Sequence, residues 1–367
     1  MNTKLKQSEN PAVLPLISII MPAYNAELFI GEAISSVLAQ TYPYWELCVI
    51  DDDSQDKTAE IVASFEDSRI KYRLVKNIRC PAGTRNVGVS EMATGEWICF
   101  LDADDLYFPN TLEKFLQTAL VLPQQMGIYG FNLYVDRAGR PIPYRSHLIP
   151  RPDGGYDLPP EFAPTVENIL LFRYFFYFCG AFLRREIFKT IPIQNLKHGE
   201  EDYLFFMDLF LQYGDKITIL PDYVYQYRCN PLSMTQDPRQ IDSQIINITS
   251  QIEKVYQNPL ISKSDRHLKP LCYAIRCRQE GFAKLLSGQK DQGRQMLLFG
   301  LRLNQTSIWL WIRHCLLVYL LSFMPTAFLR LLNGQRERYR KILLYMNSDK
   351  RMLPHNHPGE AACLISG

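Results

Sequence analysis

The sequence predicts an α/β protein with a doubly wound, mainly parallel sheet, followed by a region built of helices. Short apolar, β-branched runs alternate with helical patterns in the first third of the chain, as expected for parallel strands joined by crossover helices. Two of these runs end in blocks of aspartates, and the carboxyl ends of parallel strands meet at one edge of a sheet. After Pro238 the alternation stops, and apolar residues recur only at helical spacing.

The expected strands and helices follow one another in the order of a βαβ fold. Each expected strand is a short apolar run, and these runs lie at residues 16–21, 46–50, 70–76, 97–101 and 127–135. Each expected helix carries apolar residues at helical spacing. The first lies at residues 27–40, the second ends at residue 65, and the other two lie at residues 83–93 and 111–122. Pro22 stops the first strand, and Gly95 turns the chain into the fourth.

The fourth strand ends in the acidic block that organises the predicted site. The apolar run at residues 97–101 is followed by Asp102, Asp104 and Asp105. Three carboxylates this close repel one another unless a cation or solvent neutralises them, and hard oxygen ligands suit Mg²⁺ or Mn²⁺. One hypothesis is therefore a divalent-metal site that holds a diphosphate. A solvated acidic turn at the start of the next helix is the alternative, and this motif alone does not decide between them.

A second acidic block, in the loop expected after residues 46–50, lies at the same predicted edge. Asp51 or Asp52 could accept hydrogen bonds from a base N–H or a ribose hydroxyl. Because two strands end in carboxylates at one edge, a ligand site is favoured over a chance cluster. Arg85 could pair with a phosphate or with one of these acids, and its sequence position leaves both open.

Composition limits the class of partner and the location. The formal net charge is +2 and no long basic run occurs in the first two thirds of the chain, so nucleic acid is not an expected partner. The nine cysteines are scattered, several of them in apolar runs, and we interpret them as reduced core residues. The first apolar run, residues 13–21, is too short for a signal peptide or a membrane span, which predicts a cytoplasmic enzyme.

The order and spacing of the motifs resemble family 2 glycosyltransferases of the GT-A type, whose fold is Rossmann-like. The likeness covers residues 16–235, and no single motif in it is specific. The matching motifs are Pro22-x-Tyr24-Asn25, Ile50-Asp51-Asp52-x-Ser54-x-Asp56, Gly83-x-Arg85-Asn86-x-Gly88, Ala93-x-Gly95-Glu96-x-Ile98, Leu101-Asp102-x-Asp104-Asp105, Glu201-Asp202-x-x-Phe205, and Tyr225-x-Tyr227-Arg228 with Ser233 and Thr235.

For the donor, the resemblance implies a nucleotide-diphosphate sugar, with a UDP-linked sugar favoured. Asp51 or Asp52 would hold the nucleotide base. Pro22, Tyr24 and Asn25 would form the wall beside it.

For the chemistry, the resemblance implies a single displacement that inverts the anomeric centre, with Mn²⁺ or Mg²⁺ as cofactor. Asp104 would be the direct metal ligand, and Asp102 would contact the ribose or the waters of the metal. Arg85 would lie near the donor. Asp202 would be the general base that takes the proton from the acceptor hydroxyl.

The chain departs from the family pattern at three places. Asp53 stands where the family commonly has glycine, and Cys229 stands where many members carry histidine. The base is ambiguous by register because residues 200–202 are consecutive acids, although the spacing to Phe205 favours Asp202. The chain also lacks the Gln-x-x-Arg-Trp sequence of processive synthases, which favours the addition of a single sugar.

The resemblance and the periodicity together divide the chain into four parts. We expect a disordered or extended N-terminus at residues 1–14, a GT-A glycosyltransferase domain at 15–236, a helical C-terminal region at 237–346 and a flexible tail at 347–367. The apolar part of the helical region is short of the ~20 residues that a spanning helix requires. Residues 308–341 either bury against the catalytic domain or lie in a membrane interface, which would make the enzyme peripheral on the inner face of the cell membrane.

The function expected from the sequence is the transfer of one sugar to a glycan or lipid-linked acceptor. A polyprenyl-phosphate sugar synthase of the same fold is the nearest alternative, and activity toward a lipid phosphate would separate the two. A catalytically silent member that binds glycan or serves as a scaffold is the alternative from another class. It predicts that loss of Asp104 or Asp202 leaves the biological output unchanged.

Overall fold

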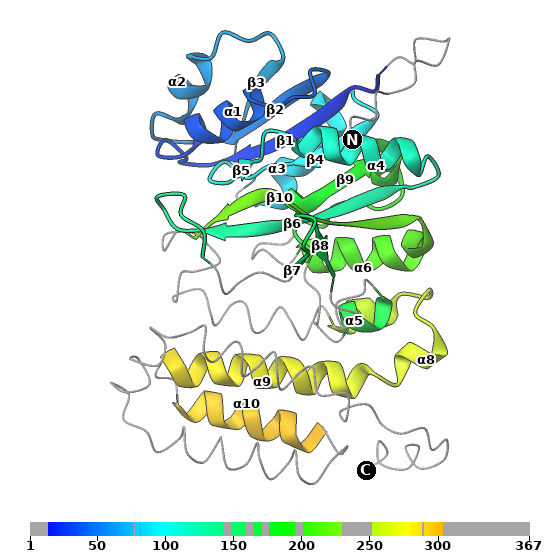
Figure 1. Cartoon of the computed structure of the whole chain (residues 1–367). Helices are drawn as coiled ribbons and strands as arrows, with labels where there is room; N and C mark the ends of the chain where they lie inside the picture. Colours follow the sequence, from blue (N-terminus) through cyan, green and yellow to red (C-terminus); the bar gives the residue numbers. More distant parts are fainter. Residues whose placement is uncertain are drawn as a thin grey trace. The chain divides into compact units, whose positions relative to one another are not determined.

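An eight-stranded sheet with helices on both faces forms the first part of the molecule (Figure 1). The computed structural model describes residues 14–76, 78, 80–142, 148–158, 165–170, 176–195, 201–229, 252–287 and 290–303. The chain divides into two compact units. The first is Met1–Pro159 with Phe176–Gln236, and the second is Pro160–Phe175 with Asp237–Gly367.

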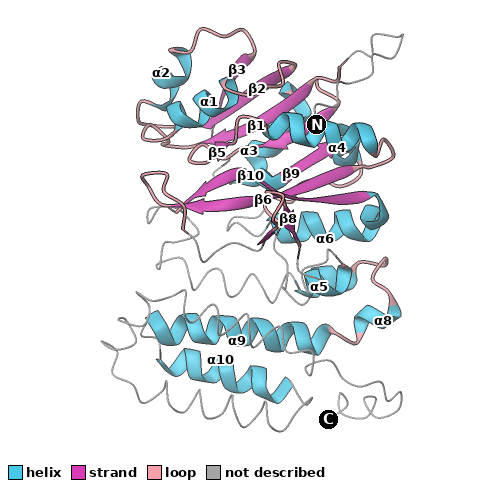
Figure 2. Ribbon diagram, in the orientation of Figure 1, coloured by secondary structure: helices cyan, strands magenta, loops and turns pink. Residues whose placement is uncertain are grey.

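The strand order of the sheet is β3-β2-β1-β4-β9-β6-β10-β5 (Figure 2). Its strands are β1 (Ile17–Ala23), β2 (Trp45–Asp52), β3 (Ile70–Val75), β4 (Trp97–Phe100), β5 (Leu106–Tyr107), β6 (Gly127–Val135), β9 (Ala181–Arg184) and β10 (Ile217–Arg228). β1 pairs in parallel with β2 and β4, β2 with β3, and β6 with β10. β9 runs antiparallel between β4 and β6, and β5 pairs antiparallel with β10. The predicted mainly parallel α/β sheet is confirmed.

The helices of this unit cover the two faces of the sheet because the strand side chains alternate. They are α1 (Ile30–Leu38), α2 (Thr58–Ala63), α3 (Pro81–Val87) continuing as η1 (Gly88–Met92), α4 (Thr111–Val121) and α6 (Glu201–Tyr213). Ile17 and Ile19 share one core cluster with residues of α1 and α4. Ile20 points to the other face, where a Cβ on Gly88 would come within 2.6 Å of it. The missing side chain of Gly88 therefore lets the helix lie close against the sheet.

Strand β1 runs through Pro22, where the sequence pattern predicted its end. The N–H of Leu101 donates to the carbonyl of Ile20, so Ile20 presents its backbone groups to β4. Residues two apart in a strand present their backbone groups to the same side, so the backbone of Pro22 faces the side on which β4 lies. On that side β4 pairs with residues 17–20 of β1 and does not reach Pro22. The missing N–H of Pro22 therefore removes no sheet hydrogen bond, and the strand continues.

A buried carboxylate ties the starts of β1 and β2 to the turn before β4. Glu46 accepts hydrogen bonds from the hydroxyl of Ser18 at 2.5 Å, the ammonium of Lys71 at 2.5 Å and the N–H of Thr94 at 2.6 Å. Burial raises the pKa of Glu46, but these hydrogen bonds outweigh it and lower the pKa to about 2. A carboxylate with a lowered pKa stabilises the fold above its unfolded pKa and loses that contribution in acid.

We expect Glu46→Gln to remove much of the pH dependence of stability in acid. The wild-type free energy of unfolding should fall as the pH drops from 4.5 toward about 2, because the folded state must then protonate Glu46. Above pH 5 the variant should be less stable by about 2 kcal/mol, and the difference should shrink as the pH falls. Urea unfolding of both proteins between pH 3 and 7 measures it. A constant difference across this range would contradict the assignment.

The described helices of the second unit include an antiparallel pair. They are α5 (Val166–Leu170), α8 (Lys263–Arg266), α9 (Lys269–Ser287) and α10 (Lys290–Leu303), and α9 and α10 lie side by side (Figure 1). Gly281 and Gly293 face each other in this pair, since a Cβ on Gly293 would come within 2.7 Å of the Gly281 carbonyl oxygen. The close approach of the two backbones therefore depends on both glycines.

Several predicted segments lie outside the described residues. They include the N-terminal 13 residues, the apolar stretch proposed for a membrane interface at 308–341, and the tail at 347–367. Within the described part of the chain, none of the helices combines the length and apolarity that crossing a membrane requires.

Candidate functional site

The carboxyl ends of β1, β2 and β4 lie at one edge of the sheet, because these strands are parallel and adjacent. The acidic blocks at the ends of β2 and β4 therefore lie at the same edge, as the sequence predicted. Asp51 and Asp52 are not loop residues, because they form the last two positions of β2. That placement explains why both acids are buried.

The two acids at the end of β2 hold neighbouring backbone and side-chain groups. Asp51 is 1% exposed, and its two oxygens accept hydrogen bonds from the N–H of Ser54 at 2.9 Å and the hydroxyl of Tyr72 at 2.8 Å. Asp52 accepts from the N–H of Ile78 at 3.1 Å. Both carboxylates therefore shape the loops at the site edge.

The loop after β1 carries the predicted nucleotide wall. Tyr24 is 63% exposed, so its ring is available to a ligand. Asn25 has a φ of 47°, its N–H donates to the hydroxyl of Ser54 at 2.8 Å, and its side-chain oxygen accepts from the N–H of Gln55 at 2.8 Å. Asn25 thus joins the loops after β1 and β2, while Pro22 precedes them at the half-buried end of the strand.

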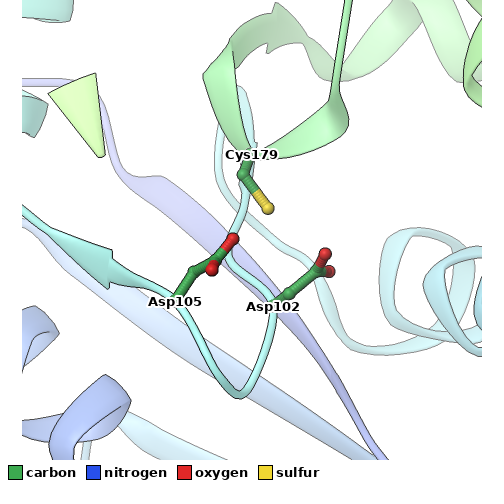
Figure 3. A group of neighbouring side chains, drawn as sticks. All are labelled: Asp102, Asp105 and Cys179. Atoms are coloured by element: carbon green, nitrogen blue, oxygen red, sulfur yellow. The ribbon is translucent and has the colours of Figure 1, made fainter. Parts of the chain in front are cut away.

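The turn after β4 brings three potential ligand atoms together. The side chains of Asp102, Asp105 and Cys179 are neighbours (Figure 3), and one ligand atom from each lies within 4.8 Å of the others. Among the described residues, this is the group of three or more acidic, cysteine or histidine side chains that lie close enough together to hold a metal ion. Asp104, the predicted direct ligand, lies in the same turn but outside this group.

Burial and the charges of neighbouring acids disfavour the charged forms of Asp104 and Asp105 in this turn. Burial raises the pKa of Asp104 to about 6, and the charge of Asp102 adds to the rise. Burial also raises the pKa of Asp105 well above its usual range, and the charges of Asp104 and Asp102 contribute. Raised pKa values in a buried acidic cluster are typical of functional sites.

Arg85 joins this turn to the helix that carries the predicted base. It is buried, and its guanidinium donates to Asp102 at 2.7 Å and to Glu201 at 2.9 Å. Of the two roles that the sequence left open, the structure shows pairing with acids. The ring of Phe178 lies 5.0 Å from the guanidinium carbon and covers it.

The predicted base, Asp202, lies in the first turn of α6 beside Glu201. Burial raises the pKa of Asp202 well above its usual range, and the charge of Glu201 adds to the rise. The charge of Arg85 and the backbone of Phe178 act in the opposite direction and lower this pKa, but by less than burial raises it. The charges of Asp102 and Arg85 also act on Asp202, so the predicted metal and base residues share one site.

The charges of the site fit a divalent cation. Among the described residues, two guanidinium groups, those of Arg85 and Arg228, are the positive charges that act on the acids of the site, which are Asp102, Asp104, Asp105, Glu201 and Asp202. Burying such an excess of negative charge is unfavourable unless the acids bind protons or a cation. Carboxylate oxygens are the ligands that Mg²⁺ and Mn²⁺ prefer, so the donor set suits either ion.

Sequence reasoning missed Cys179 and Arg228 as members of this site. Cys179 is buried, as expected of a core cysteine, but its thiol lies in the acidic group. The N–H of Arg228 donates to Asp105 at 2.9 Å, across 123 positions of the chain. A burial pattern gives no signal for either contact, although Arg228 is part of a motif that the sequence does show.

Comparison with known proteins identifies the family. Residues 18–191 match the family model described as Glycosyl transferase family 2. An uncharacterized glycosyltransferase of Haemophilus influenzae is 36% identical over 205 residues, which are 53% of this chain and 72% of that protein. The Escherichia coli UDP-Glc:alpha-D-GlcNAc-diphosphoundecaprenol beta-1,3-glucosyltransferase WfgD is 47% identical over 116 residues, 31% of this chain and 45% of that enzyme.

Solved structures share the fold at low sequence identity. Residues 1–349 of Staphylococcus aureus TarS, in complex with UDP-GlcNAc, match with a TM-score of 0.54 and 21% identity over 78% of this chain and 81% of that chain. The mannosyltransferase PcManGT of Pyrobaculum calidifontis, with GDP-Man and Mn²⁺, matches with a TM-score of 0.53 and 16% identity over 93% and 87%. Sequence, fold and the acidic edge of the sheet agree: the chain belongs to glycosyl transferase family 2 and is a glycosyltransferase.

Proposed function

We propose that this enzyme transfers one sugar from a UDP-linked donor to a hydroxyl of a lipid-linked or glycan acceptor, with inversion at the anomeric carbon. The observation that carries the proposal is the ion-pair chain in which Arg85 bridges Asp102, in the turn after β4, and Glu201, beside Asp202. It joins a metal-binding turn to a general base in a single buried site. A single displacement needs these two functions close together but on different elements.

In the proposed reaction Asp202 removes the proton from the acceptor hydroxyl. The acceptor oxygen forms a bond to the anomeric carbon as the bond from that carbon to the diphosphate oxygen breaks, and its electron pair leaves with UDP. A raised pKa makes the carboxylate of Asp202 a stronger base than that of an exposed aspartate. Mg²⁺ or Mn²⁺ held by Asp104 and Asp102 would supply stabilisation of the charge on the departing diphosphate.

The remaining residues of the edge are proposed to hold the nucleotide. The exposed ring of Tyr24 would pack on the base, beside Pro22 and Asn25. Asp51 or Asp52 would accept a hydrogen bond from the base. A UDP donor is supported by the name of WfgD and by the UDP-GlcNAc complex of TarS.

A lipid-linked acceptor is supported by the relatives. The acceptor in the name of WfgD is a sugar diphosphoundecaprenol. The name of the succinoglycan biosynthesis protein ExoO of Rhizobium meliloti, which is 30% identical over 249 residues, supports a glycan product. Such an acceptor would place the enzyme at the inner face of the cell membrane.

Thermal unfolding with nucleotides and metals tests the donor site. UDP, GDP, CMP and dTDP are each added with MnCl₂, MgCl₂ or chelator. A ligand at 100 times its dissociation constant stabilises the folded state by about 2.7 kcal/mol, which is a shift of a few degrees. We expect such a shift with UDP and metal, and a smaller one with chelator. If no nucleotide shifted the transition, the proposed donor site would be wrong.

A further inference from the structure

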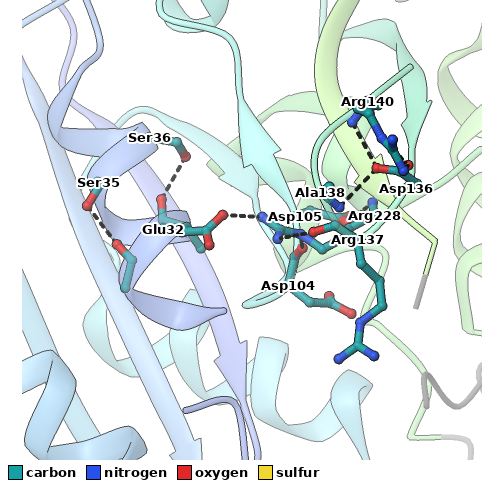
Figure 4. A network of polar contacts seen from close by, with 12 residues as sticks. Glu32, Ser35, Ser36, Asp104, Asp105, Asp136, Arg137, Ala138, Arg140 and Arg228 are labelled. Carbon is teal, nitrogen blue, oxygen red and sulfur yellow. Dashed lines mark hydrogen bonds and ion pairs between the residues drawn. The ribbon is translucent and has the colours of Figure 1, made fainter. Parts of the chain in front are cut away.

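Arg228, the last residue of β10, fixes the acidic turn through its backbone and its side chain (Figure 4). Its N–H donates to the carboxylate of Asp105 at 2.9 Å, and its Nε donates to the carbonyl oxygen of Asp104 at 3.1 Å. A third donor, Nη1, reaches the carbonyl oxygen of Arg137 at 3.3 Å. The side chain is 4% exposed, so these bonds form away from solvent.

The charge of this guanidinium is matched by a residue far away in the sequence. Glu32, in the first turn of α1, accepts from Nη2 of Arg228 at 2.6 Å across 196 positions of the chain. The ring of Phe29 lies 4.8 Å from the guanidinium carbon and covers one face of it. Among the described residues this is the one carboxylate within ion-pair distance of Arg228.

Removing the charge of Glu32 would free Arg228 to pair with a different acid. The carboxylate of Asp104 is the candidate that the geometry offers, because the backbone carbonyl of the same residue already accepts from Nε of Arg228 at 3.1 Å. An Asp104 carboxylate that pairs with a guanidinium is less available to a divalent cation. Glu32 thus holds Arg228 in the orientation that leaves Asp104 free.

We propose that Glu32 is a positioning residue for the metal site, acting through Arg228 on the turn at residues 102–105. The inference deepens the proposed function and rests on its metal-binding turn. The three nitrogens of a planar guanidinium reach three separated acceptors here, whereas the three donors of an ammonium all lie on one nitrogen, so lysine does not replace Arg228 in this role. Glu32 itself is 60% exposed, which allows its substitution without disturbing the core.

Direct measurement of Mn²⁺ binding tests this inference without relying on activity. The full-length protein is titrated with MnCl₂ in the presence of UDP, and free Mn²⁺ is followed by electron paramagnetic resonance. We expect Glu32→Gln to raise the dissociation constant for Mn²⁺ about 10-fold, the lower end of the range for residues that orient metal ligands. Arg228→Lys should raise it by at least as much.

The chain offers a matched control. Glu91 pairs with Arg73 at 2.6 Å, the same distance as the Glu32 pair, but this pair is half-exposed and joins β3 to η1. Exposed ion pairs contribute little, so Glu91→Gln should leave the dissociation constant within about 2-fold of wild type. Equal constants in Glu32→Gln and Glu91→Gln would overturn the inference.

Hydrogen exchange of the ligand-free protein separates this inference from the proposed function. Loss of the Glu32 pair should speed exchange of the Asp105 amide, which donates to the Asp102 carbonyl at 3.0 Å inside the turn. Glu91→Gln should not change it. Wild-type protein that bound no Mn²⁺ would overturn the proposed metal site, while unchanged exchange in Glu32→Gln would overturn the positioning role whatever the metal result.

Discussion

Asp202→Asn is expected to reduce sugar transfer by about 10²–10⁴-fold and to leave donor binding unchanged. Asparagine keeps the shape of aspartate, so we expect the first turn of α6 to stay in place. What it loses is the ability to take the proton of the acceptor hydroxyl. Transfer is measured from initial rates, and donor binding by calorimetry with UDP and MnCl₂.

A substitution near the other end of α6 provides the control. Asp215 is exposed in the short 3-10 helix that follows α6, so Asp215→Asn should leave both rate and binding unchanged. If Asp202→Asn abolished UDP binding together with transfer, Asp202 would be a structural residue at the helix N-terminus and not the base.

Asp104→Ala is expected to reduce metal-dependent transfer by about 10³-fold, because a metal contributes several kcal/mol of charge stabilisation. The fold should not suffer, since Arg228 holds the carbonyl oxygen of Asp104 and not its carboxylate. Removing one member of a repelling cluster should leave the melting temperature of the ligand-free protein unchanged or raise it. Calorimetry with MnCl₂ and UDP, together with thermal unfolding, measures both effects.

The outcome of Asp104→Ala also decides between two ligand sets. The sequence resemblance implies Asp104 with Asp102, whereas the geometry groups Asp102 with Asp105 and Cys179. Full Mn²⁺ affinity in the variant would contradict the first set. Cys179→Ser then tests the second, because serine keeps the size of the side chain but removes the sulfur ligand.

Local patterns account for the part of the fold that the sequence predicts. The strand at residues 97–101 and its acidic end follow from an apolar run and an abrupt change to aspartates. β9 could not be placed in the same way, because its position between β4 and β6 depends on pairing with two strands that are distant in the sequence. Periodicity carries no information about such pairing.

The same limit explains what the sequence could not show of the site. The sequence left open whether Arg85 pairs with a phosphate or with an acid. The structure shows that it pairs with Glu201, which lies 116 positions later in the chain. Glu32 and Arg228 are separated still further, and each alone resembles an ordinary surface or strand-end charge. The acidic edge itself was predictable because the carboxyl ends of parallel strands lie together whatever their separation in sequence.

The anomeric configuration of the product tests the account most directly. UDP-glucose, whose sugar is α-linked, is incubated with the enzyme, MnCl₂ and a short-chain GlcNAc-diphospholipid acceptor, and the new linkage is followed by proton NMR. If UDP-glucose gives no product, the same experiment is run with other α-linked UDP-sugars. The account predicts a β-linked product from an α-linked donor, because Asp202 drives one displacement. An α-linked product would contradict it.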